Sequence, residues 1–150
     1  MARPIQRNEG RRNEGRRNGT GRDGLASVLI IDDDDVARAV LLRMLTMAGH
    51  ETVGARDGVE GLERFRDRPP GSPVDLVITD IFMPNQEGLA TIMELRRGAP
   101  SPKIIAISGG GVRASLDVLP VAEALGAHRT LRKPFTPAEV MRVVRDVLEG

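Results

Sequence analysis

The sequence predicts an α/β domain in which a doubly wound parallel sheet of five strands carries helices on both faces. Short runs rich in β-branched residues alternate with stretches whose apolar residues recur at helical spacing. The runs VLII at 28–31 and KIIAI at 103–107 are almost continuously apolar, which is typical of strands buried on both faces. Strands that alternate with helices indicate parallel connections, so these observations together favour this class.

Five strands and five helices are expected in alternation. The expected strands are 28–31, 52–55, 74–79, 104–107 and 128–131. Apolar residues at helical spacing follow each one, beginning at Val36, Val59, Leu89, Val121 and Val140. Thr136 followed by Pro137 suits an N-cap and an early position of the last helix. Gly98 and Gly126 are expected to end their helices.

The composition excludes several classes of protein. Hydrophobic residues make up 40% of the chain, with three Phe and no Tyr or Trp, so an aliphatic core is expected. There is no cysteine, which excludes disulfides, thiolate metal sites and cysteine nucleophiles. No apolar run approaches the ~20 residues that span a bilayer, and the N-terminus lacks a signal peptide's apolar stretch. We therefore expect a cytoplasmic protein with no membrane span.

An arginine-rich arm is expected to precede the domain. Residues 1–24 hold seven Arg against three acidic residues, a net charge of +4, whereas the remainder has 15 basic and 18 acidic residues. The segment Arg-Asn-Glu-Gly-Arg occurs twice in tandem, and apolar residues are scarce. Such a segment buries too little surface to offset the entropy of ordering, so residues 1–25 are expected to be disordered and residues 26–150 to form the domain. Contact of the arm with nucleic acid or anionic lipid stays open.

Chemically active side chains follow the strands. In open parallel sheets, sites form beyond the carboxyl ends of the strands. Those positions hold Asp32 to Asp35, Asp57, Asp80, Ser108 and Lys133. Several carboxylates at one edge indicate a hard cation such as Mg²⁺, and a hydroxyl and an ammonium beside them suit an anion held by that cation. The combination predicts phosphoryl chemistry with an aspartate as nucleophile.

Residues 27–149 resemble the receiver domain of two-component response regulators, which has a flavodoxin-like fold. The resemblance is carried by VLIIDDDD, DLVITDIFMPNQEG, IIAISG and LRKPF, in that order and at suitable spacing. It implies that Asp80 is the phosphorylated aspartate. It also implies Mg²⁺ as cofactor, bound directly by Asp33 and through a water by Asp32.

The resemblance assigns the remaining site residues as well. The backbone carbonyl of Phe82 would be a further Mg²⁺ ligand, Lys133 would pair with the phosphoryl group, and Ser108 would donate a hydrogen bond to it. The Lys133–Pro134 peptide is expected to be cis. Receivers commonly carry an aromatic residue three positions before the lysine, where this chain has Thr130. With Thr130 at this position, there is no aromatic ring there whose movement a hydroxyl could control.

The remaining charged residues receive local roles. Asp34 and Asp35 are expected to start the first helix, where a carboxylate caps free N–H groups and meets the positive end of the helix dipole. Asp57 is expected to cap a helix and Asp75 to lie at a strand edge. His50 and His128 are expected at the surface or at an edge, without a metal role.

The function expected from the resemblance is that of a single-domain response regulator. A histidine kinase or a histidine phosphotransfer protein would supply the phosphoryl group, and a downstream protein would receive the signal. We expect no nucleic-acid partner for the folded domain and no dedicated enzyme activity. Two alternatives remain: a Mg²⁺-dependent phosphatase similar to the haloacid dehalogenases, since VLIIDDDDV also satisfies their first motif, and a receiver-like binding module that is not phosphorylated.

Overall fold

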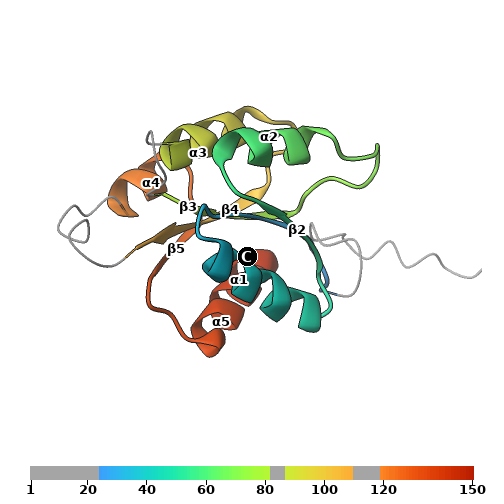
Figure 1. The fold of residues 1–150 in the computed structure, drawn as a ribbon. Helices are drawn as coiled ribbons and strands as arrows, with labels where there is room; N and C mark the ends of the chain where they lie inside the picture. The colour runs from blue at the N-terminus through green and yellow to red at the C-terminus, as the bar shows by residue number, and fades with distance from the viewer. Residues whose placement is uncertain (1–23, 82–86, 110–118) are drawn as a thin grey trace, which may run out of the picture.

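The computed structural model describes residues 24–81, 87–109 and 119–150. They form the five strands and five helices expected, in alternation (Figure 1). The strands are β1 Ser27–Ile31, β2 Glu51–Ala55, β3 Leu76–Asp80, β4 Lys103–Ser108 and β5 Arg129–Arg132. The helices are α1 Asp35–Met47, α2 Gly58–Arg66, α3 Glu87–Arg97, α4 Leu119–Leu125 and α5 Pro137–Glu149. Residues 1–23 of the predicted arm lie outside the described part.

All five strands are parallel and lie in the order β2-β1-β3-β4-β5, so the doubly wound sheet is confirmed. Helices α1 and α5 cover one face, and α2, α3 and α4 cover the other (Figure 1). Successive residues of a strand point to opposite faces. In β1, accordingly, Leu29 and Ile31 join the core beneath α2 and α3, while Val28 and Ile30 join the core beneath α1 and α5.

The start of β3 differs from the prediction. The strand begins at Leu76, two residues after the expected start at Val74. Val74 is buried at 6% exposure, so its hydrophobicity reflects core packing outside the strand. Asp75 lies at the edge as expected, where its carboxylate accepts a hydrogen bond from the Ser27 N–H at 2.8 Å.

The predicted helix ends are confirmed. Thr136 caps α5 in a capping box, in which its Oγ1 accepts from the Glu139 N–H at 3.2 Å and Glu139 Oε2 accepts from the Thr136 N–H at 3.3 Å. Asp57 caps α2 by accepting from the Glu60 N–H at 2.8 Å. Gly126 follows α4 with φ of 124°, a conformation that L side chains rarely adopt.

The two histidines have a structural role that the sequence did not indicate. His50 Nδ1 accepts a hydrogen bond from the N–H of Ala26, just before β1, and His128 Nδ1 accepts from the N–H of Ile104 in β4, both at 3.0 Å. Burial lowers the pKa of both imidazoles. The neutral form that can accept these bonds is therefore the one present near pH 7.

Among the described residues, no helix combines the length and the apolar character that crossing a membrane requires.

Candidate functional site

The parallel register brings the predicted site residues to one edge of the sheet. Asp32 follows β1, Asp80 is the last residue of β3 and Ser108 is the last residue of β4. Strands β1 and β3 pair through Ile31 and Thr79, so Asp32 and Asp80 come next in the same register. The Lys133 N–H donates to the Ser108 carbonyl at 2.8 Å, which places Lys133 at this edge as well. All four residues therefore lie at the same edge of the sheet.

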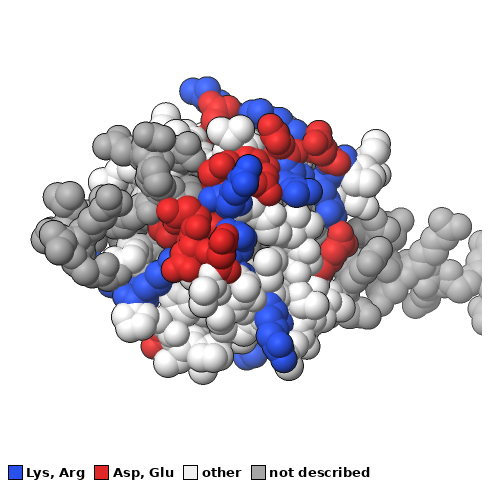
Figure 2. Space-filling view, in the orientation of Figure 1, with Lys and Arg blue, Asp and Glu red and all other residues white. Residues whose placement is uncertain are grey.

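Three carboxylates converge at this edge. Carboxylate oxygens of Asp32, Asp33 and Asp80 all lie within 4.8 Å of one another. Asp32 is 1% and Asp80 4% exposed, while Asp33 faces solvent. Figure 2 shows acidic side chains gathered on the face in view, with basic side chains beside them. Oxygen ligands of this kind fit Mg²⁺, which binds through one or two carboxylates and keeps several waters.

Lys133 lies between two of these carboxylates. Its Nζ is 2.9 Å from Asp32 Oδ2 and 3.2 Å from Asp80 Oδ2. Burial by itself lowers the pKa of the Lys133 ammonium, but its hydrogen bond to Asp32 and the charge of Asp80 outweigh that effect and raise the pKa. A permanent positive charge therefore sits beside the Asp80 carboxylate, where it can meet a further anion.

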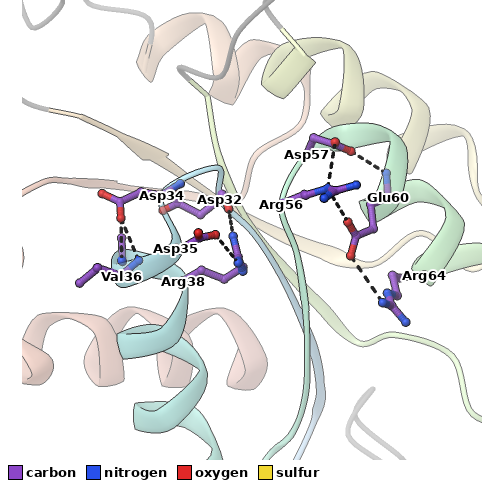
Figure 3. A network of polar contacts seen from close by, with 10 residues as sticks. Asp32, Asp34, Asp35, Val36, Arg38, Arg56, Asp57, Glu60 and Arg64 are labelled. Carbon is purple, nitrogen blue, oxygen red and sulfur yellow. Dashed lines mark hydrogen bonds and ion pairs between the residues drawn. The ribbon is translucent and has the colours of Figure 1, made fainter.

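The four consecutive aspartates have distinct positions. Asp34 is the N-cap of α1, and its Oδ1 accepts from the N–H groups of Val36 and Ala37 at 2.9 and 3.1 Å (Figure 3). The hydrogen bond from Ala37 is the largest effect lowering the pKa of Asp34. Asp35 begins α1 and pairs with Arg38 at 2.6 Å. Only Asp32 and Asp33 of the four join the carboxylate group around Asp80, as expected.

A glycine allows helix α3 to approach the site closely. A Cβ at Gly88 would lie 2.5 Å from the Asp80 carbonyl oxygen and 2.5 Å from Ile81 Cα. Contacts that short do not occur, so only glycine fits between α3 and the end of β3. Gly88 thereby fixes how close α3 lies to Asp80.

Two further expectations concern Phe82 and the peptide bond after Lys133. Phe82, the expected carbonyl ligand, lies outside the described residues. The Lys133–Pro134 peptide is cis, as expected.

Arg38 was not among the residues predicted from the sequence, yet its Nη1 donates a hydrogen bond to the Asp32 carbonyl at 2.7 Å. The sequence did contain a signal for this contact, since an arginine lies one turn into the helix that follows the acidic end of the first strand.

Comparisons with known proteins agree with this fold. The family model of the response regulator receiver domain matches residues 28–145. The chemotaxis protein CheY of Thermotoga maritima is 36% identical over 123 residues, which cover 80% of this chain and 95% of that protein. The sensor kinase CckA of Brucella abortus is 34% identical over 126 residues, which cover 84% of this chain and 13% of the kinase.

Solved structures show the same architecture. The crystal structure of the receiver domain of NtrX from Brucella abortus superposes with a TM-score of 0.70 at 30% identity, covering 81% of this chain and 98% of that one. The molecule is thus a flavodoxin-like doubly wound α/β domain with an acidic site at the carboxyl edge of its sheet. The chain belongs to the response regulator receiver domain family of two-component signalling. The comparisons lend no support to the alternative phosphatase of haloacid-dehalogenase type.

Proposed function

We propose that Asp80 is the phosphoacceptor of this receiver domain and that Mg²⁺ bound at Asp32, Asp33 and Asp80 is its cofactor. The observation that carries the proposal is the position of Lys133, whose Nζ contacts both Asp32 and Asp80 while three carboxylates lie within 4.8 Å of one another. Such a site binds a divalent cation and leaves an ammonium beside the acceptor oxygen.

The proposed reaction uses the chain's own groups in defined roles. An Asp80 carboxylate oxygen attacks the phosphorus of the donor, a new P–O bond forms, and the bond from phosphorus to the donor's leaving atom breaks with the bonding pair going to the donor. Lys133 stabilises the negative charge on the phosphoryl oxygens, and Ser108 donates a hydrogen bond to one of them. Mg²⁺, when bound, supplies electrostatic stabilisation of the same oxygens. The domain therefore receives a group from a donor and acts as a signalling component with no dedicated enzyme activity.

The binding of Mg²⁺ can be tested through its effect on the free energy of unfolding of the domain. At about 100 times its Kd, a ligand specific for the folded state adds about 2.7 kcal/mol to the unfolding free energy. We expect wild type to gain that amount from Mg²⁺, and Asp33→Ala, weakened at least about 10-fold, to gain less than about 1.5 kcal/mol at the same concentration. Urea unfolding followed by circular dichroism measures both, because the chain has no Trp or Tyr. Equal gains would contradict the assignment of Asp33.

A helix surface beside the site suits a protein phosphodonor. Val36, Val40 and Met47 lie on α1 with exposures of 74%, 49% and 77%, while Leu41 and Leu45 on the opposite side are buried. The exposed three, called here the α1 stripe, begin next to the loop of Asp32 and Asp33. We infer that a helical histidine kinase or phosphotransfer protein packs on the α1 stripe with its phosphohistidine facing Asp80. We propose that this encounter, and delivery of the signal to a downstream protein, take place in the cytoplasm.

The proposed role of the α1 stripe in docking is tested by comparing phosphoryl transfer from a protein donor with transfer from a small-molecule donor. Val40→Asp places a charge in the apolar stripe, and we expect kcat/KM for a phosphorylated histidine phosphotransfer protein to fall about 10-fold, equivalent to 1.4 kcal/mol. Labelling by acetyl phosphate is expected to stay unchanged, because Asp80 and Lys133 are untouched. Val59→Asp, on α2 with 63% exposure, is the matched control and should leave both rates unchanged. Equal transfer to Val40→Asp and wild type would exclude the stripe as the docking surface.

A further inference from the structure

Arg38 connects helix α1 to the loop that carries Asp32 and Asp33. Its Nη1 donates to the Asp32 backbone carbonyl at 2.7 Å, and its Nη2 donates to Asp35 Oδ1 at 2.6 Å. In Figure 3 both contacts lie between the end of β1 and the first turn of α1. A guanidinium presents its donors in a rigid planar fork, so the two bonds hold the carbonyl and the carboxylate in a fixed relative position.

Packing also determines where the Arg38 side chain lies. It is only 20% exposed, whereas its partner Asp35 is 84% exposed. A Cβ at Gly54 in β2 would lie 3.3 Å from Arg38 Cδ and 3.0 Å from Leu42 Cδ1. The glycine thus leaves the space through which the methylene stem of Arg38 passes beside β2. A buried stem and two directional bonds leave the head group little freedom.

Arg38 is one of several hydrogen-bond partners that hold Asp32 in position. The Asp32 N–H donates to the Ala55 carbonyl at 3.1 Å, and its carboxylate accepts from the Asp34 N–H and from Lys133, both at 2.9 Å. Because Arg38 donates to the Asp32 carbonyl and the Asp32 N–H donates to Ala55, the peptide groups before and after Asp32 are both hydrogen-bonded. The carbonyl of Asp32 belongs to the peptide that joins it to Asp33, so holding this peptide limits the directions in which the exposed Asp33 side chain can point.

We propose that Arg38 is a positioning residue for the Mg²⁺ site. It orients the Asp32–Asp33 peptide, and it keeps the Asp35 carboxylate in an ion pair outside the group formed by Asp32, Asp33 and Asp80. This inference rests on the proposed function, because it assumes that the cation binds at those three carboxylates. Residues that orient metal ligands typically change affinity by about 10- to 100-fold when they are replaced.

The test is Mg²⁺ affinity of the full chain, measured by isothermal titration calorimetry. Arg38→Met keeps the stem and removes the donors, and we expect its Kd for Mg²⁺ to rise about 10-fold. Arg38→Lys keeps the charge but lacks the planar fork, so an increase between that of Arg38→Met and wild type is expected. Asp35→Asn breaks only the exposed ion pair and should change the Kd by less than about 3-fold. Arg43→Met, at an exposed arginine of the same helix, is the matched control and should bind as wild type does.

A second measurement separates positioning from damage to the fold. With acetyl phosphate as donor, the Mg²⁺ concentration that gives half the maximal labelling rate should rise about 10-fold in Arg38→Met, the same change as the Kd, while the maximal rate stays near that of wild type. A Kd within about 2-fold of wild type in Arg38→Met, or in Arg38→Lys if the methionine variant does not fold, would overturn this inference alone. A wild-type chain that binds no Mg²⁺ would overturn the proposed function and this inference with it.

Discussion

Asp80→Asn is expected to abolish phosphoryl labelling of this protein by acetyl phosphate and by a phosphohistidine donor. The amide occupies nearly the same volume as the carboxylate, but it is a much poorer nucleophile and cannot form an acyl phosphate. Asp80 is 4% exposed at the end of β3, so a substitution of equal shape is needed to keep the surrounding packing. Intact-mass measurement after incubation with acetyl phosphate and Mg²⁺ gives the result directly.

The matched control for Asp80→Asn is Asp57→Asn. Asp57 also follows a strand, but it caps α2, and asparagine caps a helix about as well as aspartate. This variant should be labelled to the wild-type extent, and circular dichroism should show both variants folded. Full labelling of Asp80→Asn would move the acceptor to another residue and would refute the proposed function.

Lys133→Ala is expected to lower the unfolding free energy by about 3 kcal/mol in the absence of divalent cations. Breaking a buried ion pair by removing one partner typically costs about 3–5 kcal/mol, and the low end applies because the Lys133 side chain is 22% exposed. The loss arises because Asp32 and Asp80, with side chains 1% and 6% exposed, keep their mutual repulsion and lose the cation between them. Urea unfolding at about pH 7 with a chelator present measures the effect.

Saturating Mg²⁺ is expected to recover most of that loss, because a bound cation offsets the same two carboxylates. The sequence contains only one other lysine, Lys103, at the start of β4 and the opposite edge of the sheet. Lys103→Ala should cost less than about 1 kcal/mol, with or without Mg²⁺, because Lys103 is partly exposed and lies far from the carboxylates of the site. Equal destabilisation of the two variants would show that Lys133 has no special relation to Asp32 and Asp80.

The architecture, and the edge of the sheet at which the candidate site residues gather, could be predicted from the sequence. Alternating apolar periodicities are a local property of the chain, and they placed all five strands within two residues of their observed limits. Parallel strands end at a common edge, so the spacing along the chain was enough to bring Asp32, Asp80, Ser108 and Lys133 together. The caps at Asp34, Asp57 and Thr136 were predictable because a cap binds N–H groups two or three residues away, which is equally local.

Contacts between side chains and backbone groups that are distant in sequence could not be predicted in the same way. His128 accepts from Ile104, 24 residues earlier, and nothing local distinguishes it from a surface histidine. In the sequence Arg38 resembles an ordinary surface residue of a helix, yet its stem passes close to Gly54 and its Nη1 donates to the Asp32 carbonyl. Val74 is buried although it lies outside β3. These three features depend on the direction of a side chain and on the space that neighbouring elements leave for it. Both are set when the helices pack on the sheet, and spacing along the chain does not determine them.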